Sequence, residues 1–78
     1  MTSTEALRWT ERLFELQERT IEEETTREEI DAWDSLGVLT LMAGLNEDFG
    51  IEMTDLELQS LKTVKDILAL IQNKGLLT

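Results

Sequence analysis

The segment from Asp34 to Gly50 has the sequence DSLGVLTLMAGLNEDFG, and it predicts a helix with two apolar faces. Asp34 and Ser35 both favour the start of a helix, and Gly50 suits the position just beyond the last turn, so the helix should end at about Phe49. At about 100° per residue, five apolar side chains share one side, as expected for a core face. They are Val38, Leu41, Met42, Leu45 and Phe49.

A second apolar set, which we call the outer stripe, falls on nearly the opposite side and consists of Leu36, Leu39 and Ala43. A helix on the surface of a small bundle needs only one apolar stripe. The outer stripe is therefore either an exposed patch that contacts something, or a second buried face of a wedged helix. Gly37 and Gly44 also share a face. We interpret them as points of close packing, since glycine costs about 1 kcal/mol relative to alanine inside a helix.

The rest of the chain predicts three more helices. The 78 residues allow one domain, residues 1–78. The expected fold is all-α, a small four-helix bundle with a long loop between the first two helices and a short third helix. The three further helices are one from about Ser3 to Gln17 opened by Thr2, a short one through Leu61 opened by Thr54, and a last one opened by Thr63 and stopped by Gly75.

The long loop, Glu18–Asp34, holds eight acidic residues and two arginines. A loop of this length in a small domain needs anchors or a function. Ile21, Ile30 and Trp33 are the expected anchors, and we interpret Trp33 as an aromatic residue that covers the core.

Composition excludes several classes of function. With 7 basic and 17 acidic residues the net charge is −10, which disfavours binding to nucleic acid or to an anionic membrane surface. The absence of histidine and cysteine removes the commonest general base and metal ligands, so we expect no catalytic residues and no resident metal. No apolar run approaches a membrane span and the first residues lack a signal-peptide pattern, so we expect a cytoplasmic protein. We also expect it to be a monomer.

Two stretches carry a resemblance to a known family. WDSLG at residues 33–37, followed by a helix that ends in NEDFGI at residues 46–51, resembles the acyl carrier proteins, the small acidic four-helix carriers of fatty-acid and polyketide pathways. The resemblance covers essentially the whole chain. It implies that Ser35 bears a 4′-phosphopantetheine arm, transferred from coenzyme A by a separate, magnesium-dependent phosphopantetheinyl transferase.

The resemblance also implies roles for neighbouring residues. Asp34 would help to orient the metal of the transferase, and Leu36 would contact partner enzymes. Because such an enzyme must approach the root of the arm, we expect it to cover the rest of the outer stripe, Leu39 and Ala43, and to contact Glu47 as well. In well-known fatty-acid carriers the exposed side of this helix bears several acids. Here those positions hold Gly37, Thr40 and Asn46.

This departure suggests a specialised stand-alone carrier that serves the acyl-loading and acyl-receiving enzymes of one pathway. An aminoacyl or peptidyl carrier remains an alternative. So does an unmodified acidic module that binds a basic partner through Glu18–Asp34. Without the family, Ser35 would be an ordinary N-cap with Asp34 preceding it in the loop.

Overall fold

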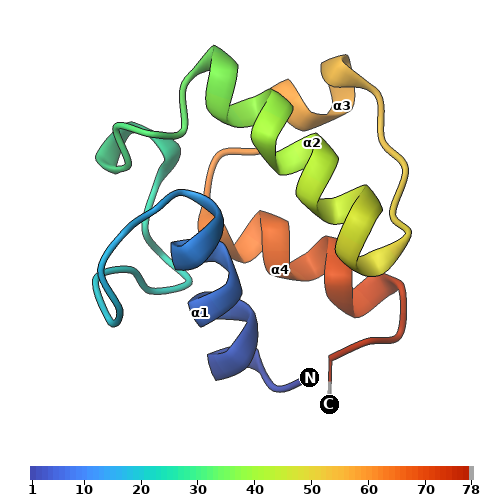
Figure 1. Ribbon diagram of the computed structural model, residues 1–78, viewed down its shortest axis with the longest axis horizontal. Helices are drawn as coiled ribbons and strands as arrows, with labels where there is room; N and C mark the ends of the chain where they lie inside the picture. The colour runs from blue at the N-terminus through green and yellow to red at the C-terminus, as the bar shows by residue number, and fades with distance from the viewer. Residues whose placement is uncertain (78) are drawn as a thin grey trace.

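A computed structural model describes residues 1–77, which form four α-helices and no β-strand. Figure 1 shows α2 crossing the bundle, with the long loop on one side of it. α2 packs against α3 and α1, and α1 also packs against α4. The all-α bundle is confirmed, and no helix in this part of the chain is long and apolar enough to cross a membrane. The helices are α1 (Ser3–Leu13), α2 (Ser35–Phe49), α3 (Asp55–Gln59) and α4 (Val64–Asn73).

Reciprocal capping starts three of these helices. In each, a threonine side chain accepts an N–H from the first turn, and an acidic side chain in that turn accepts the N–H of the threonine. Backbone N–H donors are the main cause that lowers the pKa of Glu5, Glu57 and Asp66. Because the folded-state pKa is lowered, each cap stabilises the fold above the ordinary carboxyl pKa. That contribution is lost as the pH falls through the lowered value. The pairs are Thr2 with Glu5, Thr54 with Glu57 and Thr63 with Asp66.

Two helices end earlier than predicted. α1 stops at Leu13 and not at Gln17, because Glu15 takes a left-handed conformation with φ 57°. The N–H of Leu16 then bonds to the carbonyl of Glu11 at 2.8 Å, which is a Schellman cap formed without the usual glycine. α3 stops short of the predicted Leu61, since its last turn tightens into hydrogen bonds that span three residues.

The core joins all four helices and the long loop. On α2, Val38, Leu41 and Leu45 are buried as predicted, and Met42 and Phe49 pack against them partly buried. The three predicted loop anchors are also buried, which confirms that the loop is plugged into the bundle. They are Ile21, Ile30 and Trp33.

The long loop is held by hydrogen bonds as well as by its anchors. It contains a short 3₁₀ helix, η1 (Arg27–Glu29), which the sequence did not predict. The N–H of Arg27 donates to the carbonyl of Lys62 at 2.8 Å, and the N–H of Val64 donates to the carbonyl of Thr25 at 2.9 Å. At the other end of the loop, the fully buried carboxylate of Glu11 accepts the N–H of Thr20 at 2.9 Å. These bonds make the loop an ordered layer of the domain.

Two glycines of α2 mark its closest contacts. A Cβ on Gly37 would overlap the carbonyl oxygen of Ala32, and one on Gly44 would lie 2.6 Å from a terminal methyl of Leu13. The prediction of close packing is confirmed at both positions. Gly37 is buried. It therefore does not lie on the exposed side of the helix, although the sequence analysis counted it there among the positions that hold acids in fatty-acid carriers.

We expect Gly37→Ala to destabilise the domain and Gly44→Ala to be nearly neutral. The carbonyl of Ala32 belongs to the backbone, so relieving the overlap must move the loop and should cost about 2 kcal/mol. The methyl of Leu13 can rotate away, and alanine recovers about 1 kcal/mol of helix propensity. Urea denaturation of the two variants measures the difference. A Gly37→Ala domain at least as stable as the unsubstituted protein would contradict the tight contact.

Candidate functional site

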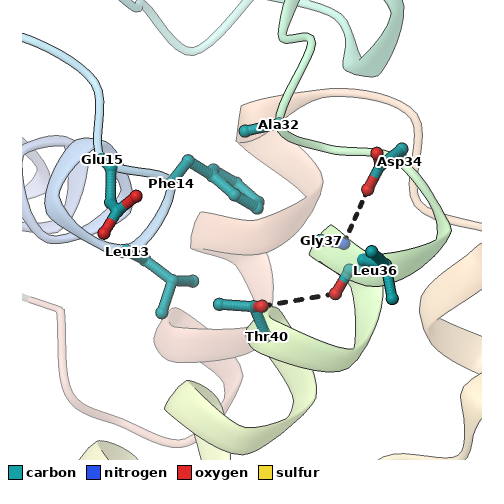
Figure 2. A pocket seen from close by; sticks show the side chains of 8 residues that line it. All are labelled: Leu13, Phe14, Glu15, Ala32, Asp34, Leu36, Gly37 and Thr40. Atoms are coloured by element: carbon teal, nitrogen blue, oxygen red, sulfur yellow. Dashed lines mark hydrogen bonds between the residues drawn. The ribbon is translucent and has the colours of Figure 1, made fainter.

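The start of α2 is built by Asp34. Its backbone is extended, its carboxylate oxygen Oδ1 accepts the N–H of Gly37 at 2.9 Å, and its carbonyl accepts the N–H of Val38 at 2.9 Å. Figure 2 shows the Asp34–Gly37 bond. Asp34 is therefore the N-cap and Ser35 is the first helical residue, so the alternative in which Ser35 is an ordinary N-cap is wrong.

Because Asp34 caps the helix, the hydroxyl of Ser35 is not needed for capping. The side chain is exposed, and within residues 1–77 its hydroxyl makes no hydrogen bond. The backbone N–H groups of Ser35 and Leu36 likewise have no partner in the described chain. This hydroxyl thus stands at the positive end of a helix, beside two free N–H donors, where a phosphate group is favoured.

Trp33 supports the backbone just before this cap. The indole is 2% exposed and stacks on Phe14, with ring centroids 5.8 Å apart and an angle of 24° between the rings. The side chain covers the core, as interpreted from the sequence. Its indole N–H is buried without a hydrogen-bond partner among residues 1–77.

The outer stripe is exposed. Leu36 is 73% and Leu39 52% exposed, and Ala43 is exposed as well, whereas Val38 on the core side is completely buried. The alternative of a helix buried on both sides is therefore wrong. Sequence reasoning missed a further exposed leucine, Leu56 on α3 at 82%. A helix of five residues is too short for periodicity to assign its faces.

Few charges accompany the outer stripe. The acidic residues of α2 are Glu47 and Asp48. Asp48 Oδ2 accepts the indole N–H of Trp9 at 2.7 Å and so belongs to the contact between α1 and α2. Glu47 is exposed and has no partner in the described part of the chain. It is the acidic side chain of this helix that makes no hydrogen bond or ion pair within residues 1–77.

Two hollows flank the start of α2. One, of about 300 Å³, lies between the end of α1 and the start of α2, and Figure 2 shows Phe14, Leu36 and Thr40 on its wall. The other, of about 530 Å³, is lined by Ser35 together with Arg27 and Trp33 from the loop. Residues 1–77 contain no cluster of three or more acidic residues that could hold a metal ion.

Comparison with known proteins identifies the family to which the chain belongs. The family model for the phosphopantetheine attachment site matches residues 32–71, a range that contains the whole of α2. The chain is 42% identical over 57 residues to an acyl carrier protein of Thermosynechococcus vestitus, an alignment that covers 73% of this chain and 69% of that protein. The chain belongs to the acyl carrier protein family.

Other relatives match a shorter stretch. An acyl carrier protein of Helicobacter hepaticus is 49% identical over 39 residues, and one of Campylobacter hominis is 45% identical over 40. Each of these alignments spans about half of both chains.

The family carries 4′-phosphopantetheine as a covalently attached prosthetic group, and this acyl carrier protein does so too. When attached, the group supplies a thiol that holds acyl cargo as a thioester. The start of α2 fits such a group, because an exposed hydroxyl stands next to unpartnered N–H donors. The chain has no cysteine of its own, so the prosthetic group is the source of the thiol.

We expect the two simplest substitutions of Asp34 to separate its cap from its charge. Asp34→Asn keeps a side-chain oxygen for the N–H of Gly37 and should change the free energy of unfolding by less than about 0.5 kcal/mol. Asp34→Ala loses the cap and should cost about 1 kcal/mol. Thermal and urea unfolding test both variants. Equal stability of the two would mean that the bond to Gly37 contributes nothing.

Proposed function

We propose that Ser35 is the attachment residue and that the protein is a specialised carrier of acyl intermediates. The supporting observation is the free Ser35 hydroxyl at the first position of a capped helix whose next turn is apolar and exposed. The matched region contains one other serine, Ser60. Its hydroxyl donates to the carbonyl of Glu57 at 2.6 Å, at the negative end of α3, where a phosphate group is disfavoured.

Ser3 provides an internal comparison. Like Ser35 it is the first residue of a helix, it is exposed, and its hydroxyl makes no hydrogen bond within residues 1–77. It is followed by Thr4 and Glu5, however, and lacks the exposed apolar turn. A free hydroxyl at a helix start is therefore not sufficient, and we attribute the choice of serine to the surface that the transferase can cover beside it.

We expect Ser35→Ala to take up no arm and Ser3→Ala to take up one. The measurement is intact mass after incubation with a promiscuous phosphopantetheinyl transferase, magnesium and coenzyme A. Ser3→Ala is the matched control, because it removes the same group from the equivalent position of another helix. Full loading of Ser35→Ala would refute the assignment. No loading of the unsubstituted chain would favour an unmodified acidic module.

Asp34 has a second proposed role, the orientation of the transferase metal. Its carboxylate is exposed beside Ser35, and one oxygen is already used by the cap. The Asp34→Asn variant retains that cap, so a loss of arm transfer in this variant reports the charge alone.

We further propose that acyl-loading and acyl-receiving enzymes dock on the outer stripe and on Glu47. An enzyme that handles the cargo must approach the root of the arm at Ser35, and the leucines one turn away offer apolar contact there. α2 offers fewer acidic side chains to a partner than the equivalent helix of the well-known fatty-acid carriers. This difference supports a specialised carrier that serves its own set of enzymes. The acids of the loop then act mainly on the rate of association.

We expect Leu39→Ala to lower turnover by a partner enzyme several-fold while barely changing the melting temperature. Its side chain is half exposed, so truncation removes contact area for the partner and little of the core. The comparison variant replaces Glu22, Glu23 and Glu24 with glutamine. It should cost less turnover, and that cost should shrink at high salt. If Leu39→Ala unfolds the domain and turnover per folded molecule is unchanged, the stripe belongs to the core.

The remaining proposals concern whether the chain itself takes part in catalysis and which kind of cargo it carries. Family members are carriers and not catalysts, and the lack of histidine and cysteine supports a chain that leaves activation to its partners. An aminoacyl or peptidyl carrier would use the same serine, and loading assays with acyl and aminoacyl donors distinguish the two kinds of cargo.

A further inference from the structure

Arg27 links three parts of the fold next to Ser35. It opens η1 in the long loop, and its guanidinium Nε donates to the carbonyl of Trp33 at 2.9 Å. Nη1 of the same group donates to the side-chain oxygen of Gln59 at 3.1 Å and to its carbonyl at 3.5 Å. Trp33 lies two residues before Ser35, and Gln59 is the last residue of α3. One side chain thus joins the loop, the approach to α2 and the end of α3.

The backbone of Arg27 is itself anchored. Its N–H bonds to the carbonyl of Lys62 at 2.8 Å, and its carbonyl accepts the N–H of Ile30 at 3.1 Å. The guanidinium therefore projects from a fixed point. A planar guanidinium that bonds to two residues through two of its nitrogens also fixes the orientation of both partners, which a single-point donor such as lysine cannot do.

The charges around Ser35 give the arginine a second effect. It is the basic residue in the wall of the 530 Å³ hollow beside Ser35, where three acidic residues accompany it. Repulsion among those carboxylates would spread the loop away from the start of α2, and the guanidinium opposes this. The acids are Glu28, Asp31 and Asp34.

We propose that Arg27 is a positioning residue for Ser35. By holding the carbonyl of Trp33, it sets the direction in which the chain enters Asp34 and keeps that residue in its capping conformation. The hydroxyl of Ser35 is then presented at one orientation to the transferase. The inference rests on the proposed function in that Ser35 is taken as the site of arm transfer. The effect of Arg27 on the helix cap does not depend on that assignment.

The test compares Arg27→Gln with Arg19→Gln. Arg19 lies in the same loop, is exposed and makes no hydrogen bond or ion pair within residues 1–77, so its replacement removes the same charge without removing such an interaction. We measure kcat and KM for arm transfer from coenzyme A. We also measure hydrogen exchange of the Gly37 and Val38 amides, which bond to Asp34. Exchange of the Ile71 amide in α4 reports global stability.

For Arg27→Gln we expect kcat to fall about tenfold with KM little changed, and the Gly37 and Val38 amides to exchange about tenfold faster. Arg19→Gln should match the unsubstituted protein in all three measurements. Gln59→Met, which removes one acceptor and no charge, should produce a smaller change in the same direction. It also provides the test if Arg27→Gln does not fold.

Several results would overturn the proposal. A rise in KM alone would mean that Arg27 touches the transferase directly. Full activity of Arg27→Lys would mean that the charge of Arg27, and not the geometry of its bonds to Trp33 and Gln59, is what matters. If the unsubstituted chain accepts no arm on Ser35, the proposed function fails. The exchange of Gly37 and Val38 still decides the role of Arg27, since unchanged exchange in Arg27→Gln would refute it.

Discussion

The site depends on a close approach between two backbones, where the carbonyl of Ala32 leaves no room for a side chain at Gly37. This contact brings the end of the long loop against the first turn of α2. Trp33 can then enter the core while Asp34 turns outward to cap the helix, and Ser35 becomes the first helical residue. A bulkier residue at position 37 would force the loop to enter at another angle and would displace cap and serine together.

The local features of the fold could be predicted because their causes are local. Capping boxes lie within four residues of sequence, and the two faces of α2 follow from the helical repeat. The end of α1 could not be predicted, since Glu15 adopts a conformation that normally marks a glycine. η1 was missed for another reason: the backbone of Arg27 is held by Lys62, a residue distant in sequence.

The candidate site was predicted in part, and through resemblance more than through physics. The resemblance along the whole chain pointed to Ser35, but the sequence left open whether Asp34 or Ser35 capped the helix. Ser3 shows why geometry alone would not have chosen the serine, because it has the same free hydroxyl at a helix start. The reach of Arg27 to Trp33 and Gln59 depends on tertiary packing and leaves no pattern in the sequence.

The exposed leucines and the free serine share one end of a single helix, and this limits how many proteins can bind there at once. A protein large enough to cover Leu36 and Leu39 also shields Ser35, which lies within a turn of both. If partner enzymes dock here as proposed, two of them cannot be engaged at this end at the same moment, and each must leave before the next arrives. Tight binding by any one enzyme would then slow the whole series of reactions on the carried group. Short residence times on the carrier therefore favour fast turnover of the series.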